Sequence, residues 1–536
     1  MFSGLRTVSA WTLISRILGL ARDIGMATLF GGGALFDAFT VAFRIPNLAR
    51  RLFGEGALTT AFLPAFVKER QQNGPDAAWQ LTTAVLYTLA ALLGGVVLVA
   101  DLALGAVLAT VSLSYETQLL VSLTAIMLPY LVLICLAAQI SAVLNALEHF
   151  AVPALLPVAL NVVWIAAIWG VCPFLESANQ QIHTVAIAVV IGGVIQLALT
   201  WPKIRSYGFR WHPDWRAARG QVVSIGKAMM PILLGLSITQ LNTLCDSLIA
   251  WGFSAPEKLT EARLWDRWDY PLQSGAASAL FLGQRIYQFP LGVFGVALGT
   301  VLFPRFAMHA DRQHLDQLRD DLTLGLKLIL VIGVPASVGL VLLAEPLSAL
   351  LFQYKSFDAD DTAATSAMIA AYGLGVWAYC GLLIIQRAFY AVDDRETPMR
   401  IGLLAVVLNV TLNMVLTWPF GAKGLAISTA VSAIFQFLLT VWRFRNRLEG
   451  DFDWPSIGST FGKTLLATTI MTIVCVAARN SIAADAVFWH RLLRVALPLL
   501  ASIAVFAYAA KWLVIPEFFM LLKRKKTNDQ ASMTKG

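Results

Sequence analysis

Apolar stretches of about 20 residues recur along almost the whole of this 536-residue chain. Residues 81–100 and 182–200 are examples, and each can cross the roughly 30 Å hydrocarbon core of a bilayer as one helix. Hydrophobic residues make up 58% of the chain and charged residues 13%, whereas soluble domains average about 45–50% and 25%. Water cannot cover so apolar a surface, so the sequence predicts an integral membrane protein.

The apolar stretches alternate with short polar loops, which is typical of a polytopic membrane protein. We therefore expect an all-α polytopic membrane protein with about fourteen transmembrane helices. The expected spans are 7–30, 36–66, 79–110, 118–146, 153–174, 182–202, 222–252, 275–304, 322–352, 363–391, 399–418, 423–443, 460–479 and 492–514.

The basic residues favour one orientation of these spans. If the N-terminus is cytoplasmic, the segment 203–219 with its five basic residues also lies inside, whereas loops 111–117 and 173–181, on the opposite side, have none. Because cytoplasmic loops are enriched in lysine and arginine, both termini are expected in the cytoplasm. The +8 formal charge thus suits a membrane protein better than nucleic-acid binding. The basic residues that do not fit are Arg479, Arg491 and Arg494.

An internal repeat relates the two halves of the chain. Residues 57–66 and 297–306 share five identities in ten positions, and residues 144–147 align with 389–392, each followed by a proline nine residues after its start. We expect two parallel-repeat six-helix lobes plus two C-terminal helices, with a substrate site between the lobes. The expected parts are 1–215 (six spans), 216–450 (six spans) and 451–536 (two spans and a basic cytoplasmic tail).

Several charged residues stand inside the first, second and eighth expected spans, although each costs roughly 2.5–3.5 kcal/mol near the bilayer centre. They are Arg16, Arg22, Asp23, Asp37, Arg44, Arg50, Arg51 and Glu55 in the first two spans and Arg285 in the eighth. One interpretation is internal ion pairing, such as Arg22 with Asp23 or Arg51 with Glu55. Six arginines face only three acids, so positive charge remains to bind an anion or water.

The choice of arginine also favours an anionic ligand, because a planar guanidinium binds two phosphate oxygens at once. Arg16 and Arg22 are six residues apart, which places them roughly on one helix face. We therefore expect a water-filled central cavity that binds a polyanion attached to a lipid.

The sequence contains no pattern typical of catalysis. The five cysteines stand singly, so neither disulfides nor a metal site is expected, and no Walker motif or Ser/His/Asp set is present. A membrane enzyme acting on lipid diphosphates remains an alternative, with Asp358, Asp360 and Asp361 as its nearest acidic cluster. That cluster is more simply interpreted as the solvated start of a helix.

Several motifs resemble those of the MurJ (MviN) family of lipid II flippases, within the multidrug/oligosaccharidyl-lipid/polysaccharide exporter superfamily. They are 15–23 (SRILGLARD), 37–39 (DAF), 43–48 (FRIPNL), 50–57 (RRLFGEGA), 289–300 (FPLGVFGVALGT), 351–354 (LFQY), 389–391 (FYA), Asp394 and 397–398 (TP). The likeness covers nearly the whole chain and is weakest after about residue 450. It implies a two-lobe transporter of the bacterial cytoplasmic (inner) membrane, not an enzyme, which alternates between inward-open and outward-open states.

The resemblance also implies which residues bind the substrate. The family's cavity residues fall on Arg16, Arg22, Asp23, Asp37, Arg50 and Arg285. Arg22, Asp23 and Arg285 would meet near the substrate diphosphate. Some family members have an aspartate before the span-8 arginine, where this chain has Gln284.

A sodium ion is the one cofactor that the resemblance implies, since some members bind Na⁺ in the second lobe. The matching positions are Asp246, Asn409, Asn413 and Thr429. Their oxygens suit a hard cation. The alternative is that Asp246 only hydrogen-bonds neighbouring polar groups, and Asn413 stands where other members have a second carboxylate.

The expected partners are lipid II, an undecaprenyl-diphosphate-linked muropeptide, and membrane lipids, with no nucleic acid. Whether proteins of cell-wall synthesis bind the chain stays open. Two transport alternatives remain: a flippase for O-antigen or capsule lipid-linked sugars, which would share the basic cavity, and a drug/cation antiporter, which should have an acidic one.

Overall fold

The computed structural model describes residues 2–54, 56–212, 214–257, 263–264, 267–311, 314–447 and 452–522, and nearly all of these residues are helical. The β-structure in these ranges consists of two isolated bridges, Ser254 with Leu272 and Leu264 with Trp268. The expected all-α class is therefore confirmed.

The chain folds into two compact units. The first comprises Met1–Phe281 and Phe352–Asp361. Its helices are α1 (Phe2–Phe30), α2 (Ala34–Ala49), the π-helical turn η1 (Arg50–Gly54), α3 (Ala57–Gln72), α4 (Pro75–Thr110), α5 (Tyr115–Ala146), α6 (Ala151–Ala166), η2 (Ala167–Val171), η3 (Cys172–Phe174), α7 (Ala178–Ser206), η4 (Trp215–Ala218) and α8 (Arg219–Gly252). Helix α9 (Ala276–Pro290) also begins in this unit.

The second unit comprises Leu282–Leu351 and Thr362–Gly536. Its helices after α9 are the π-helical turn η5 (Leu291–Gly295), α10 (Val296–Asp311), α11 (Leu315–Leu342), α12 (Ala344–Phe352), α13 (Ala359–Gly373), α14 (Val376–Ala391), α15 (Glu396–Phe420), α16 (Ala422–Arg445), α17 (Trp454–Asn480), α18 (Phe488–Trp512) and α19 (Pro516–Leu522). The predicted boundaries at residues 215 and 450 remain predictions.

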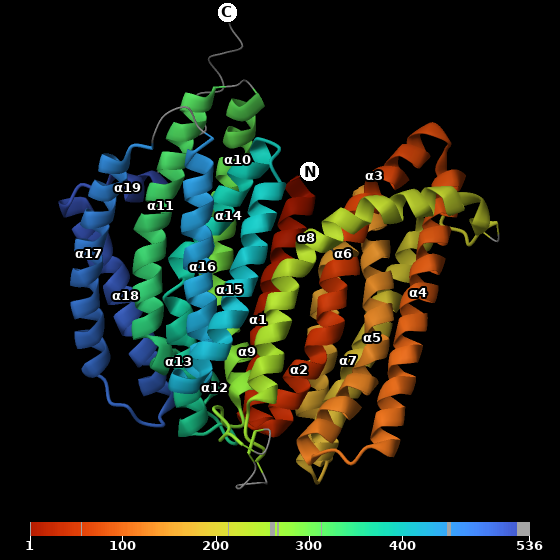
Figure 1. Ribbon diagram of the computed structural model, residues 1–536, viewed down its shortest axis with the longest axis horizontal. Helices are drawn as coiled ribbons and strands as arrows, with labels where there is room; N and C mark the ends of the chain where they lie inside the picture. Colours follow the sequence, from red (N-terminus) through yellow and green to blue (C-terminus); the bar gives the residue numbers. More distant parts are fainter. Residues whose placement is uncertain are drawn as a thin grey trace, which may run out of the picture. The chain divides into compact units, whose positions relative to one another are not determined.

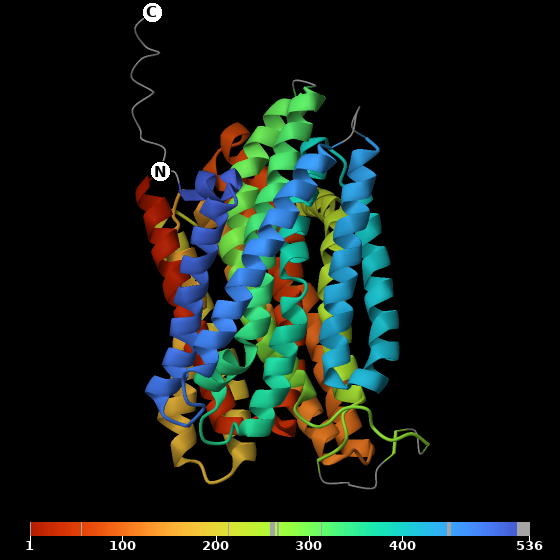
Figure 2. The same ribbon diagram turned by 90° about the vertical axis from the view of Figure 1, so that its left-hand side faces the viewer.

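Helix α5 lies at the centre of the first unit, where it packs against α2, α4 and α7 (Figure 1). Helix α6 packs against α1 and α7, so it connects the charged first helix to the rest of the unit. In the second unit α15 pairs with α16 and α17 with α18, shown in cyan to blue in Figure 2.

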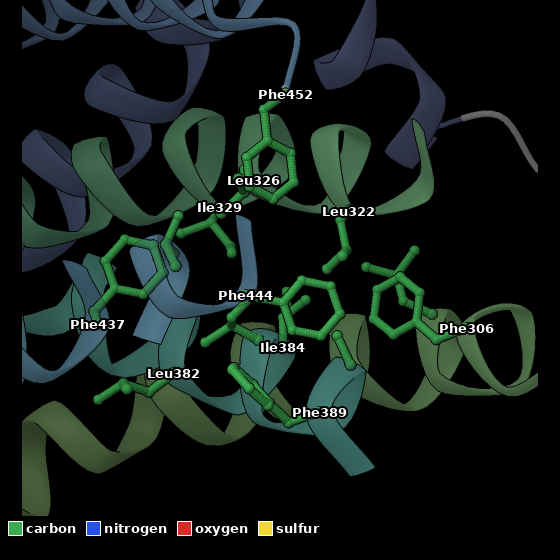
Figure 3. Packing of buried hydrophobic residues seen from close by; sticks show 14 of the residues in the cluster. Phe306, Leu322, Leu326, Ile329, Leu382, Ile384, Phe389, Phe437, Phe444 and Phe452 are labelled. Atoms are coloured by element: carbon green, nitrogen blue, oxygen red, sulfur yellow. The ribbon is translucent and has the colours of Figure 1, made fainter. Parts of the chain in front are cut away.

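Aromatic side chains form much of the core of the second unit (Figure 3). Phe306 from α10, Phe389 from α14 and Phe444 from α16 are at most 1% exposed. The rings of Phe389 and Phe444 meet edge to face, with centroids 4.8 Å apart. This geometry adds about 0.5–1.5 kcal/mol to the hydrophobic gain of burial. The core thereby connects α10, α14 and α16.

Large apolar side chains are exposed on the outer helices. On α4, Leu98, Val99 and Leu102 are 61%, 68% and 65% exposed. Such a continuous apolar face is unstable in water, whereas lipid tails cover it without cost. This pattern supports the predicted membrane location.

The predicted count of fourteen spans is not confirmed. Among the described helices, eleven are long and apolar enough to cross a membrane, or twelve if α13 and α14, bent by 43°, form one span. The expected spans 7–30 and 36–66 are not among them. Both are helical, but α1 carries Arg16, Arg22 and Asp23, and the second segment is divided into α2, η1 and α3.

The two halves share local features at the positions that the predicted repeat aligns. A π-helical turn precedes α3 and another precedes α10. After α5, Glu148 has a φ of 60°, and after α14, Asp393 has a φ of 57°. Next to them, the His149 amide donates to the Leu144 carbonyl at 2.8 Å and the Asp394 amide to the Phe389 carbonyl at 2.9 Å. These pairs lie 245 residues apart, as the aligned motifs require.

Candidate functional site

The Arg22 guanidinium is held in place from several sides within the first unit. Asp23 accepts from its Nη2 at 2.6 Å and from its Nε at 3.0 Å, and Asn161 Oδ1 accepts from its Nη1 at 3.2 Å. The Trp164 ring lies 4.3 Å from the guanidinium, within cation–π range. Arg22 is 4% exposed and Asp23 2%. The predicted ion pair is therefore present, and α6 supplies two further contacts.

Asn161 of α6 contacts α1 at further points besides Arg22. It lies beside Gly19, where a Cβ would be 3.6 Å from Asn161 Nδ2, an ordinary van der Waals distance. The Asn161 amide also donates to the Ser15 carbonyl at 3.1 Å. Asn161 therefore links two turns of α1 and fixes the position of Arg22. Arg16, by contrast, is exposed and lies about 9 Å along the helix from Arg22.

Asp37 caps the start of α9. Its carboxylate accepts from the Gly275 amide at 2.8 Å and from the Ser278 amide at 2.6 Å, and the residue is 1% exposed. A carboxylate satisfies the unpaired amides at a helix N-terminus and interacts favourably with the helix dipole. The structure therefore gives Asp37 a contact that the sequence did not predict, with a helix start 238 residues further along the chain.

A glycine turn makes this contact possible. Gly31 has a φ of +65°, a conformation that side chains disfavour. The Gly32 amide donates to Asp361 Oδ2 at 2.8 Å, and Gly275, with a φ of +96°, lies against the Gly32 carbonyl. The turn between α1 and α2 thus contacts both the start of α9 and the start of α13.

The remaining arginines of the expected second span lie at the end of α2 and in η1. Arg44 and Arg50 are half-buried, and Arg51 is exposed and donates to Gln240 of α8 at 3.2 Å. The predicted partner Glu55 lies outside the described residues. Arg50 is part of the π-helical turn, a feature that is frequent at functional sites.

In the second unit, Arg285 is exposed on α9, whereas its neighbour Gln284 is buried. Gln284 Nε2 donates to the Tyr372 hydroxyl at 3.3 Å. The residue that replaces the aspartate of some family members is thus held by α13 beside the exposed arginine.

Three of the four predicted sodium ligands lie together in the second unit. Asn409 Nδ2 donates to Thr429 Oγ1 at 3.2 Å, and Asn413 Nδ2 donates to Asn409 Oδ1 at 3.1 Å. Their oxygens are of the kind that hard cations prefer. Asp246, the predicted carboxylate ligand, is 2% exposed on α8 of the first unit. The oxygens of Asn409, Asn413 and Thr429 fit a monovalent cation, provided that they exchange these hydrogen bonds for the ion.

The acidic cluster of the enzyme alternative is a helix start. Asp358 Oδ1 accepts from the Asp361 amide at 2.9 Å, and Asp361 binds the Gly32 amide. Within the described ranges, no three His, Cys, Asp or Glu side chains are arranged to hold a metal ion.

Two contributions to the site were missed at the sequence level. They are Asn161 and Trp164, and neither is among the predicted site residues. Neither has a signal in the sequence, because the pairing of α6 with α1 spans 139 residues between Arg22 and Asn161.

Comparison with known proteins covers most of the chain. Residues 26–497 match the family model described as lipid II flippase MurJ. A probable lipid II flippase MurJ of Vibrio cholerae is 34% identical over 444 residues, or 81% of this chain and 80% of that protein. The lipid II flippase MurJ of Burkholderia cenocepacia is 33% identical over 459 residues, which cover 83% of this chain and 84% of that protein.

Solved structures show the same fold. A lipid II flippase MurJ in an inward closed conformation aligns with a TM-score of 0.74 at 21% identity, over 95% of this chain and 99% of that one. An inward-facing multidrug resistance MATE family transporter of the MOP superfamily aligns with a TM-score of 0.63 at 13% identity, over 81% and 94%. The chain is thus a multi-pass membrane transporter, and it belongs to the MurJ family of lipid II flippases.

Proposed function

We propose that this protein moves lipid II from the cytoplasmic to the outer leaflet of the bacterial inner membrane by alternating access. Its family membership supports the substrate. The observation that carries the mechanism is Arg22, a guanidinium buried in the first helix and oriented by Asp23, Asn161 and Trp164. Such an arginine is preorganised for phosphate oxygens, since its position is fixed before the ligand arrives.

Arg16, Arg22, Asp23, Asp37, Arg50 and Arg285 form the proposed substrate site. The lipid diphosphate binds the arginines while the lipid tail stays in the bilayer. Asp23 keeps Arg22 neutralised until the diphosphate competes for it. Asp37 acts indirectly, because both of its described contacts are to the start of α9.

Neutralisation of the arginine surplus favours closure on the cytoplasmic side. An inside-negative potential then assists outward movement of the anion by about 2.3 kcal/mol per net charge per 100 mV. Sodium bound by Asp246, Asn409, Asn413 and Thr429 is a second candidate source of energy, supported by the clustering of the last three residues.

We further propose fourteen membrane crossings, with both termini cytoplasmic. Helix α1 and the segment from α2 to α3 are the two crossings that carry most charge.

Three arginines near the end of α17 and the start of α18 lie on the outer side in this arrangement, and each has a local acceptor. Arg479 donates to the Leu342 carbonyl at 3.1 Å, Arg491 to the Ala349 carbonyl at 3.4 Å, and Arg494 pairs with Glu345 at 3.3 Å. Their role in helix packing explains why they depart from the positive-inside rule.

The test is outward exposure of lipid II in cells depleted of their own flippase and supplied with this chain or its Arg285→Ala variant. Rescue by the wild type but not by the variant supports the proposal. A well-expressed wild type that leaves lipid II unexposed contradicts it. Exposure of O-antigen or capsule lipid-linked sugars, measured in the same cells, would then identify the alternative substrate.

A further inference from the structure

The internal repeat extends to α1 and to α8, the helix that starts the second half of the repeat. Residues 13–30 and 236–253 share five identities in 18 positions, and in this alignment the two helices end within one residue of each other. Asp23 is paired with Asp246, and each is 2% exposed. The two halves therefore place a buried carboxylate at the same position of the same helix.

A buried asparagine accompanies each of these carboxylates in the repeat. The motif 160–162 (LNV) on α6 aligns with 408–410 (LNV) on α15, which pairs Asn161 with Asn409. Asn161 is 6% exposed and Asn409 1%. Asn409 and the aspartate of α8 are two of the predicted sodium ligands. The first half thus has the same two types of cation ligand at the matching positions.

The two halves differ in the residue before the aspartate, which is Arg22 in the first half and Cys245 in the second. The Arg22 guanidinium donates to Asp23 Oδ1 from Nη2 at 2.6 Å and from Nε at 3.0 Å, and to Asn161 Oδ1 from Nη1 at 3.2 Å. A cysteine offers no such cation. The first half therefore supplies its carboxylate and amide oxygens with a cation of its own, whereas the predicted ligands of the second half require an ion from solution.

The surroundings of the guanidinium favour positive charge in general and not only arginine. Asn161 Nδ2 donates to the Ser15 carbonyl at 3.1 Å, so the amide is oriented with its oxygen toward the cation. Carboxylate and amide oxygens are ligands that hard cations prefer. The Trp164 ring, whose centroid is 4.3 Å from the guanidinium carbon, also attracts cations. These groups therefore suit a small cation when the guanidinium is absent.

We propose that Na⁺ binds Asp23 and Asn161 when Arg22 leaves them for the lipid diphosphate. The inference rests on the proposed flippase function and adds a cation site to the first half. Asp23 is buried, and a buried carboxylate that loses its cationic partner is strongly destabilised unless another cation replaces that partner. Because coupling between two binding sites is reciprocal, Na⁺ and the diphosphate should then strengthen each other's binding.

The first test asks whether the site binds Na⁺ once the guanidinium is removed. Asp246→Asn serves as the parent protein, since it removes the predicted sodium carboxylate of α8, and binding of radioactive Na⁺ is measured on the purified full chain in nanodiscs. Arg22→Ala in this parent should bind Na⁺ that the parent does not, and added guanidinium should displace the ion. A further Asp23→Asn substitution should abolish this binding. The matched control is Arg16→Ala, which removes an exposed arginine of the same helix and should create no Na⁺ binding.

The second test keeps Arg22 and measures the affinity of the Asp246→Asn parent for undecaprenyl diphosphate in sodium chloride and in choline chloride of equal ionic strength. Na⁺ should raise this affinity about fivefold or more, which is the lower end of typical coupling between two sites. Asp23→Asn should abolish the difference between the two salts.

The outcomes separate this inference from the proposed function. Equal affinity of the parent in both salts would overturn the inference, even where Arg22→Ala does not fold, and so would a folded Arg22→Ala protein that binds no Na⁺. An affinity that depends on pH but not on Na⁺ would also overturn it, because a proton then replaces Arg22 at Asp23. Failure to bind undecaprenyl diphosphate in either salt contradicts the proposed function, whereas binding that is independent of Na⁺ contradicts only this inference.

Discussion

At the scale of single residues, the charged side chains of the first two helices divide into two kinds. Arg22 and Asp37 are buried, and each has several partners that fix its position. Arg16 and Arg51 are exposed on their helices. In a membrane segment the first kind is stabilised by its partners, and the second requires water or a ligand.

Arg22→Lys should reduce lipid II transport strongly while the protein stays folded. Lysine keeps the charge but cannot bind Asp23 and Asn161 together in one plane while stacking on Trp164. Lipid II exposure in depleted cells measures the effect. The control is Arg443→Lys, because Arg443 also stacks on a tryptophan, Trp442, at 4.9 Å. Equal lipid II transport by wild type and Arg22→Lys would show that the planar geometry of the Arg22 guanidinium is unimportant.

Asp37→Asn should lower the free energy of unfolding by about 1–3 kcal/mol, the range for a lost charge-assisted hydrogen bond in a buried site. The amide keeps the shape but loses the charge and one acceptor for the start of α9. Thermal unfolding of the purified protein measures the change. Asp76→Asn, at the exposed first turn of α4, should have almost no effect. A similar loss in both variants would contradict the capping role.

At the scale of helices, the loops that follow α5 and α14 share their backbone geometry, and the loop after α14 also contains an ion pair. Asp394, after α14, has a side chain that is 8% exposed and pairs with Arg447 at 2.7 Å, at the end of α16. It also accepts from the Thr397 amide at 3.0 Å. The carboxylate therefore joins the loop, the start of α15 and the end of α16.

The ion pair between Asp394 and Arg447 should be sensitive to acid. Burial alone would raise the pKa of Asp394, but the hydrogen bonds from Thr397 and the charge of Arg447 lower the pKa below its ordinary value. The folded-state pKa of Asp394 is below its unfolded-state pKa. The interactions of this carboxylate therefore stabilise the fold above the ordinary carboxyl pKa, and this stabilisation is lost as pH falls through the folded-state pKa. Asp394→Asn should therefore be less stable than wild type at pH 7, with the gap narrowing below about pH 4. A gap independent of pH in thermal unfolding would contradict this account.

At the scale of the whole molecule, the helices and their repeat could be predicted because apolar periodicity and local motifs are properties of neighbouring residues. The count of fourteen spans stays a prediction, since the first two expected spans are not among the helices that are long and apolar enough to cross a membrane. Contacts such as Asp37 with Ser278 were also beyond prediction, because a capping carboxylate and a helix start 241 residues away share no sequence pattern. The contact of Asn161 with Arg22 was likewise beyond prediction, because it depends on how α6 packs against α1.

Single cysteines in a cysteine-free background should show on which side of the membrane four of the proposed loops lie. Ser114→Cys and Ser481→Cys should react with an impermeant thiol reagent added outside intact inner-membrane spheroplasts, whereas Asn73→Cys and Ser206→Cys should react only after permeabilisation. These positions lie at helix ends on alternate sides of the proposed arrangement. Labelling of Asn73→Cys from outside would show that the first two segments do not both cross.

The most direct test of the central claim is transport of lipid II by the purified chain in vesicles of defined lipid. The account predicts that wild-type protein brings labelled lipid II to the opposite leaflet, where an impermeant reagent reaches it, and that Arg22→Ala does not. An inside-negative potential should speed movement out of wild-type vesicles. Lipid II that crosses no faster with wild-type protein than in protein-free vesicles would contradict the account.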